Sequence, residues 1–253
     1  MSQTTPTAGL LTVVLVHGAF ADASSWIGVI ERLQKEGVQV TAPANPLRGL
    51  SSDSAYIASF LNQVSGPVLA VGHSYGGAVI TTAATTARNV VGLVYVAAFA
   101  TDEGERLGDV ESNSKDSVLS AALVQLQYPT GQGAQTAVEF AINPAHFHDA
   151  FAADLPAEKT AIMAATQRPA AELAFSEPSG VPAWKTLPSW AVVATGDKAA
   201  GSDVIRAMAK RAGATITEIE GSHVIMISQP QVVTDVILSA IAAVGSAEER
   251  HSS

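Results

Sequence analysis

Residues 68–77, VLAVGHSYGG, join a short apolar run to a Gly-His-Ser-Tyr-Gly turn and a further glycine. The apolar run at 68–71 predicts a buried strand, and the small residues at 76–78 allow a helix to begin directly behind it. Ser74 is therefore expected on a tight strand-to-helix turn, which Gly72 and Gly76 make sterically possible. In that position its hydroxyl would point out of the sheet, as a nucleophile requires.

Two sets of backbone N–H groups are expected beside this hydroxyl. The first N–H groups of a helix have no partner within it, so that of Tyr75 is free to stabilise an oxyanion. Residues 10–17, LLTVVLVH, predict the first strand, and the glycine-containing loop behind it lies where open α/β sheets bind ligands. The second oxyanion donor is therefore expected to be Ala19, with Phe20 as the open alternative.

The rest of the chain alternates between strand and helix patterns. Further buried strands are predicted at 38–42, 90–97, 190–195 and 215–219, and helices at about 24–33, 52–64, 203–212 and 231–244. Strand–helix–strand repeats connect in a right-handed sense and give a mostly parallel sheet with helices on both faces. The fold class expected is therefore α/β, with a doubly wound sheet.

Residues 100–185 lack this regularity and are repeatedly interrupted by proline. Helical patterns at 118–126 and 134–142 indicate a helical cap inserted after the fourth predicted strand and lying over Ser74. We expect one domain over 1–253, with a core at about 10–99 and 186–245 and a cap at about 100–185. Predicted walls of the substrate pocket are Phe20, Phe99 and Trp184, with Trp26 and Tyr75 as further candidates.

A serine hydroxyl needs a base near neutrality and a carboxylate that fixes the tautomer of that base. Asp197 and His223 follow two successive late strands, so both should reach the sheet edge that carries Ser74. Asp203 also follows the first of these strands, but it directly precedes a helix and fits a capping role better. Asp102, which follows an earlier strand, is the fallback acid.

Composition excludes several other classes of function. The net charge is −9 and lysine and arginine form no cluster, which argues against a nucleic-acid partner. The chain has no cysteine, and its apolar run at 10–16 is too short to span a membrane, so a cytoplasmic protein is expected. His146 and His148 could suggest a metal site, but one local cluster is weak evidence, and no metal or other cofactor is expected. The oligomeric state stays open.

The segments VLVHGAF, VGHSYGG, TGDK and GSHVIMISQP together resemble the α/β-hydrolase superfamily, with its Ser, Asp, His order. Within it, the chain is most similar to small bacterial hydrolases related to plant methylesterases and hydroxynitrile lyases. Those lyases usually carry threonine and lysine where this chain has Ala19 and Val224, which argues against cyanohydrin cleavage. The resemblance supports ester hydrolysis. We therefore expect a carboxylic ester hydrolase without a cofactor, and we predict small to medium uncharged esters as its substrates.

Two other functions use the same residues or the same fold. A cofactor-free perhydrolase or haloperoxidase-like enzyme would use Ser74, Asp197 and His223 with peroxide in place of water. A non-catalytic ligand receptor on a hydrolase fold would not need an intact serine, histidine and aspartate set. The sequence therefore favours catalysis over binding alone, but it does not separate ester hydrolysis from the peroxide-dependent reaction.

Overall fold

The computed structural model describes residues 10–251, with side chains as far as residue 246. Its main sheet has six strands in the order β2-β1-β3-β4-β8-β9, and every neighbouring pair is parallel. The strands are β1 (Thr12–Val16), β2 (Gln39–Thr41), β3 (Val68–His73), β4 (Val90–Val96), β8 (Ser189–Ala194) and β9 (Thr215–Ile219). All six correspond to strands predicted from the sequence, and the predicted α/β fold class is confirmed.

Helices cover both faces of this sheet, as right-handed connections require. They are α1 (Ile27–Lys35), which follows the 3-10 helix η1 (Ala23–Trp26), then α2 (Leu50–Gln63), α3 (Tyr75–Ala83), α9 (Ser202–Arg211) and α11 (Pro230–His251). Helix α1 packs against α11, α2 packs against α3, and α9 contacts β8 and β9. Helix α11 extends past the predicted end at residue 244. No helix in the described chain is both long and apolar enough to cross a membrane.

The register of the central strands brings distant parts of the sequence to one edge. Strand β1 pairs with β3 from Thr12↔Val68 to Val16↔Gly72, and every residue of both strands is buried. Residues that follow Val16 therefore lie beside residues that follow Gly72. Strands β8 and β9 end at the same edge because the whole sheet is parallel, so the loops that follow all four strands can form one site.

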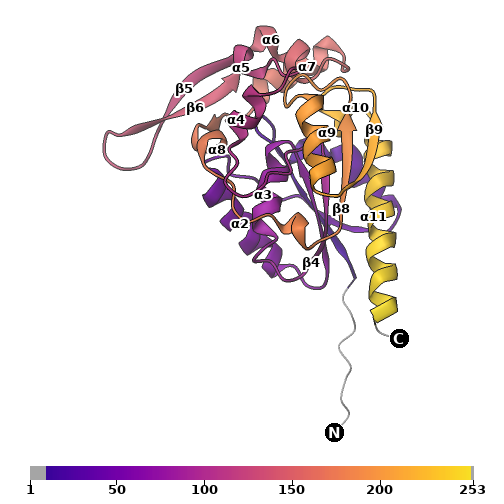
Figure 1. Cartoon of the computed structure of the whole chain (residues 1–253). Coiled ribbons are helices and arrows are strands. Elements are labelled where there is room, and N and C mark those ends of the chain that lie inside the picture. Colours follow the sequence, from indigo (N-terminus) through magenta and orange to yellow (C-terminus); the bar gives the residue numbers. More distant parts are fainter. Residues whose placement is uncertain (1–9, 252–253) are drawn as a thin grey trace.

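The cap fills the interval between β4 and β8, and most of it lies beyond the carboxyl ends of the strands (Figure 1). Its helices are α4 (Leu107–Ser112), α5 (Leu119–Ala122), α6 (Pro144–Phe151), α7 (Ala157–Thr166), α8 (Leu173–Ser176) and the 3-10 helix η2 (Ala183–Lys185). Its strands are β5 (Leu123–Pro129), β6 (Thr136–Ile142) and β7 (Ala170–Ala171). Strands β5, β6 and β7 form a separate antiparallel sheet, and the β5–β6 hairpin extends away from the core in Figure 1.

The two helices predicted inside the cap are wrong for most of their length. Only α5 is helical within 118–126, and 134–142 contains strand β6 instead of a helix. The reason lies in the pattern of 123–129, LVQLQYP, where apolar and polar residues alternate with a period of two, as in a strand with one face covered. The connecting loop supplies Gly131 and Gly133, both with positive φ, which a tight reversal of the chain tolerates.

Candidate active site

Ser74 lies on the predicted sharp turn between β3 and α3. Its backbone has φ 52° and ψ −123°, a strained conformation for a residue other than glycine. A Cβ atom on Gly72 would lie 2.6 Å from the backbone of Gly76, and one on Gly76 would collide with the carbonyl oxygen of Val16. Both glycines are therefore required by close approach of the backbone. The residue is 7% exposed, so a substrate would reach it from the cap side.

The loop that follows β1 is fixed by a buried histidine. The His17 ring donates from Nδ1 to the carbonyl of Gly18 (2.9 Å) and accepts at Nε2 from the N–H of Asn45 (2.9 Å). These two bonds require the neutral ring, and burial lowers the pKa of His17 accordingly. Ala19 and Phe20 come next and are both buried, and Phe20 has φ 61°. This loop is thus held rigidly where an oxyanion donor was predicted.

Asp197 and His223 meet in the interior of the protein. The Nδ1–H of His223 donates to Oδ2 of Asp197 at 2.8 Å, and each residue is 1% exposed. The other oxygen, Oδ1, accepts the N–H groups of Ala199 and Ala200 at 2.9 and 3.0 Å, so the carboxylate has three donors. The His223 ring does not hydrogen-bond Ser74 within the described chain, and such contacts in unliganded enzymes are often long.

The two competing carboxylates have other partners. Asp203 lies in the first turn of α9 and accepts the N–H of Lys115 at 2.9 Å and the hydroxyl of Ser114. Asp102 forms an ion pair with Lys185, with 2.7 Å between Oδ1 and Nζ. Neither contacts His223, so of the three predicted acids the structure brings only Asp197 to the histidine.

His73, which sequence reasoning left without a role, touches His223 in two ways. Its Nε2–H donates to the backbone carbonyl of His223 at 2.9 Å, and the two rings lie 4.7 Å apart between centroids. Complete burial lowers the pKa of His73 well below its usual value, so the ring is neutral. This contact links the residue before the candidate nucleophile directly to the candidate base, and no local sequence pattern predicts it.

The side chain of Tyr75 is buried where the core meets the cap, with its ring 6.4 Å from that of Phe175 on α8. Its hydroxyl donates to Oδ2 of Asp53 at 2.7 Å, and Asp53 also accepts the N–H of Arg48 at 3.1 Å. Burial raises the pKa of Asp53, and burial beside that carboxylate raises the pKa of Tyr75. The side chain of Tyr75 is thus held by Asp53, while its predicted backbone and wall roles stay predictions.

Arg48 connects the core to the cap. Its Nη1 lies 2.8 Å from Oε2 of Glu139 on β6, and its Nη2 donates to the carbonyl of Pro169. The guanidinium also lies over the ring of Tyr128, 4.5 Å from its centroid. These partners are about 80 to 120 residues along the chain, so the pattern around Arg48 alone could not predict them.

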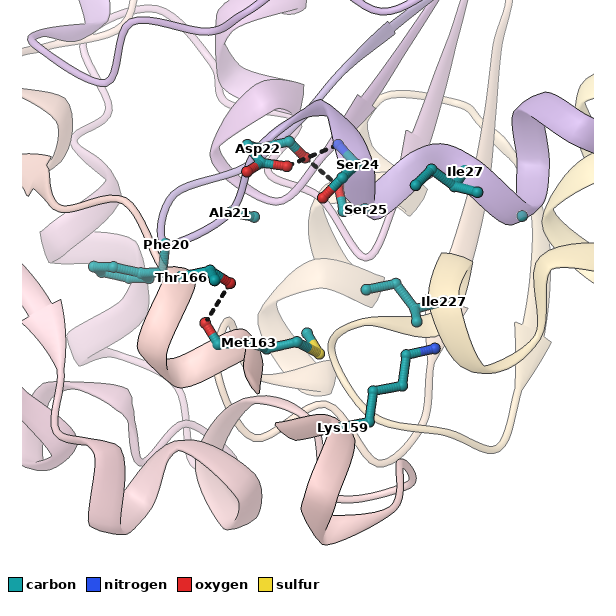
Figure 2. Close-up of a pocket in the computed structure, with 11 residues that line it drawn as sticks. Phe20, Ala21, Asp22, Ser24, Ser25, Ile27, Lys159, Met163, Thr166 and Ile227 are labelled. Atoms are coloured by element: carbon teal, nitrogen blue, oxygen red, sulfur yellow. Dashed lines mark hydrogen bonds between the residues drawn. The ribbon is translucent and has the colours of Figure 1, made fainter. Parts of the chain in front are cut away.

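A cavity of about 370 Å³ adjoins the loop that follows β1. It opens between the start of α1 and cap helix α7, with Phe20 and Asp22 on one side and Lys159, Met163 and Thr166 on the other (Figure 2). The lining does not include Ser74, Asp197 or His223, so the cavity lies next to the candidate reacting groups rather than on them. Phe20 belongs both to the lining of this cavity and to the loop that follows β1.

An aromatic cluster from the cap surrounds the same loop. Phe20 stacks on Phe175 (6.1 Å between centroids) and meets Phe151 edge-on (6.3 Å), and Phe151 packs against the His223 ring at 5.1 Å. Phe147 and Phe151 face the core, as their spacing of four predicted. Phe175 was missed, because its helix α8 has only four residues and gives no periodic signal.

The other predicted wall residues differ in position. Phe99 is buried, and its N–H donates to the backbone carbonyl of Ser74 at 3.2 Å. Trp26 is completely buried against the ring of His73. Trp184 donates from Nε1 to the carbonyl of Thr101, and it does not line the cavity of Figure 2. Phe20 is thus the predicted wall residue with a direct place at that cavity.

The histidines of the cap have surface positions. His148 donates from Nδ1 to Asp149 (2.8 Å) and from Nε2 to the carbonyl of Leu155 (3.2 Å), so both ring nitrogens are occupied. The bond to Asp149 raises the pKa of His148. Among the described residues, no group of three or more histidine, cysteine, aspartate or glutamate side chains is arranged to hold a metal ion.

Comparison with known proteins decides the family. A profile described as the Alpha/beta hydrolase family matches residues 13–236. The chain belongs to this family. The α/β-hydrolase resemblance inferred from the motifs is thereby confirmed, and the match includes the β1 loop, the Ser74 turn, Asp197 and His223. A search of curated protein sequences found no significant match.

Solved structures share the α/β-hydrolase fold over nearly their whole length. Polyneuridine aldehyde esterase has a TM-score of 0.76 at 19% identity, with 92% of this chain and 99% of that chain covered. Tomato methylketone synthase I, complexed with 2-tridecanone, has a TM-score of 0.74 at 20% identity, covering 93% and 99%. The pyrethroid hydrolase PytH has a TM-score of 0.73 at 19% identity, covering 93% and 98%. At these identities the likeness shows the fold.

Proposed function

We propose that this α/β hydrolase is a cofactor-free carboxylic ester hydrolase in which Ser74, His223 and Asp197 act as a catalytic triad. The observation that carries the proposal is the buried 2.8 Å hydrogen bond from His223 to Asp197, at the sheet edge where the strained Ser74 turn lies. A carboxylate in this position holds the imidazole in the tautomer whose Nε2 can accept a proton.

The reaction proceeds in two halves. In the first, Oγ of Ser74 attacks the ester carbonyl carbon while its proton passes to Nε2 of His223, and the oxyanion accepts hydrogen bonds from the N–H groups of Tyr75 and of Ala19. His223 then gives that proton to the departing alkoxide, leaving an acyl group on Ser74. In the second half, His223 takes a proton from water, the resulting hydroxide attacks the acyl carbon, and the acid leaves as Ser74 regains its proton.

The surroundings support an apolar, small to medium ester as the small-molecule substrate. Phe20, Phe151 and Phe175 form an aromatic wall beside the proposed oxyanion loop. Lys159 lines the cavity of Figure 2, so one cationic side chain lies near the proposed site although the sequence predicted an uncharged substrate. The names of two structural neighbours, an esterase and a pyrethroid hydrolase, accord with ester hydrolysis.

Reaction with a fluorophosphonate probe, followed by peptide mass spectrometry, tests the nucleophile. We expect rapid labelling of Ser74 in the wild type, and none at this residue in Ser74→Ala or after heat denaturation. Hydrolysis of short p-nitrophenyl esters should fall by several orders of magnitude in Ser74→Ala, since loss of the nucleophile has that effect in serine hydrolases. Retained turnover in that variant would disprove the assignment. A peroxide-dependent halogenation assay separates the haloperoxidase-like reaction.

A further inference from the structure

The cap holds the loop of His223 through one carboxylate. Asp154 accepts the backbone N–H of Ser222 at Oδ2 (2.9 Å) and the hydroxyl of Ser222 at Oδ1 (2.5 Å). Ser222 is buried and directly precedes His223, whereas Asp154 lies in the cap about 70 residues away in sequence. Both carboxylate oxygens of Asp154 thus accept hydrogen bonds from Ser222, the residue next to the proposed base.

The segment that carries Asp154 is itself braced. It follows α6, and the turn after that helix is closed by the His148 ring, whose Nε2–H donates to the carbonyl of Leu155 at 3.2 Å. Phe151, at the end of the same helix, packs its ring against that of His223. The cap therefore contacts the proposed base at two points, the face of its ring and the backbone of its loop.

The other contacts of this loop come from the core. The N–H of Gly196 donates to the carbonyl of Gly221 at 3.0 Å, and His73 donates to the carbonyl of His223. Both of these bonds use carbonyl oxygens of the loop. Within the described chain, the N–H of Ser222, which lies between Gly221 and His223, has no partner from the core. Asp154 accepts that N–H, and hydrogen bonds to an ionised carboxylate are stronger than neutral ones. Although burial raises the pKa of Asp154, its hydrogen bonds, chiefly the two from Ser222, outweigh burial and lower that pKa overall.

We infer that Asp154 is a positioning residue for catalysis: through Ser222 it fixes the backbone of His223 and so limits where the ring can approach Ser74. This inference rests on the proposed function. Misplacement of a reacting group by about 1 Å can lower a rate by about 100-fold, so loss of this contact should be visible in turnover. Because Asp154 acts on the base and not on the substrate, its removal should lower kcat and leave KM nearly unchanged.

The test compares Asp154→Ala with Glu177→Ala on p-nitrophenyl esters. Glu177 is a matched control because it too is a cap carboxylate that accepts a core backbone N–H, that of Ser51 on α2, at 2.8 Å. We expect kcat to fall by about 10- to 100-fold in Asp154→Ala and hardly to change in Glu177→Ala. Asp154→Asn, which keeps one acceptor oxygen and is least disruptive to folding, should show a smaller fall. Equal kcat values for all the variants would overturn the inference.

Ser222→Ala and a spectroscopic measurement complete the test. The double variant Asp154→Ala, Ser222→Ala should be no slower than Asp154→Ala alone, because Asp154→Ala already removes the hydroxyl bond that Ser222→Ala deletes. The low-field proton NMR signal of His223 Nδ1–H reports the bond to Asp197 and does not depend on ester turnover. It should broaden or disappear in Asp154→Ala only. An unchanged signal would overturn the inference even if Ser74→Ala had already disproved ester hydrolysis.

Discussion

The backbone of Ser74 is held by hydrogen bonds from the core, whereas the loops of Asp197 and His223 are also hydrogen-bonded to the cap. The backbone carbonyl of Ser74 accepts the N–H groups of Gly77 and Phe99, and both donors belong to the core. The loop of Asp197, at 197–203, is instead bound along its length by cap residues 114–118. Examples are the bonds from Val118 N–H to the Lys198 carbonyl (2.8 Å) and from Ser202 to Asp116 (2.7 Å).

This difference separates two ways of building one site. The nucleophile's position follows from close-packed backbone, so side-chain changes in the cap should hardly move it. The loops of the candidate acid and base also depend on hydrogen bonds across the interface between cap and core, and each such bond contributes only about 0.5–3 kcal/mol. The cap should therefore control the efficiency of proton transfer, while the core controls whether a nucleophile exists at all.

The largest effect is expected from Asp197→Asn, which changes the carboxylate that accepts the hydrogen bond from His223. The amide can keep the geometry but favours the wrong tautomer of His223, and loss of the acid in this way lowers kcat by about 10⁴-fold in a serine protease. Steady-state kinetics on p-nitrophenyl esters measure it. Asp203→Asn and Asp102→Asn are the controls and should have little effect, because neither carboxylate contacts His223. Near-normal activity in Asp197→Asn with a collapse in either control would reverse the assignment.

A smaller effect is expected from Tyr75→Phe, and it should be on stability instead of rate. The change removes the hydroxyl bonded to buried Asp53 but keeps the backbone N–H, so kcat should be nearly unchanged. The free energy of unfolding should fall by about 1.5–3 kcal/mol, typical of a hydrogen bond to a charged group. Urea denaturation measures this loss.

Tyr95→Phe provides the matched control for that measurement. Its hydroxyl is equally buried but is bonded to the neutral hydroxyl of Thr81 at 2.8 Å, so its loss should cost only about 1 kcal/mol. A large fall in kcat for Tyr75→Phe would contradict the view that the core holds the oxyanion side through backbone alone.

The smallest effect concerns Glu111, a carboxyl on cap helix α4 that faces Asp197 and His223. Burial raises the pKa of Glu111 from its ordinary value of 4.5 to about 7. Between these values the folded protein retains a proton that the unfolded chain releases, so this group's contribution to stability falls as pH rises through that range. Glu111→Gln removes the titration and should be more stable than the wild type at pH 8, by on the order of 1 kcal/mol.

Thermal denaturation at pH 5 and pH 8 measures this effect. The advantage of Glu111→Gln should be larger at the higher pH, and the exposed substitution Glu103→Gln, in the same cap, should show no such trend. An advantage of Glu111→Gln that is the same at both pH values would mean that this carboxyl does not titrate between them in the folded protein.

Much of the core could be predicted from local patterns. Continuous apolar runs such as 12–16 and 68–71 suit strands buried on both faces, and the glycines around Ser74 specify a turn that few other sequences allow. The cap was harder, because short segments with both apolar and polar residues fit helix and strand patterns alike. The alternation of apolar and polar residues in 123–129 indicates a strand, but it overlaps the segment 118–126 that was interpreted as a helix.

By itself, the sequence determined the parallel sheet, the strained Ser74 turn and the order in which the candidate serine, aspartate and histidine occur, because each depends on a few neighbouring residues. Only the tertiary structure decided that His223 bonds to Asp197 and not to Asp102 or Asp203, and that Asp154 and His73 hold the histidine loop. These contacts join residues 26 to 150 positions apart, where direction and distance depend on how whole elements pack. No local propensity carries that information.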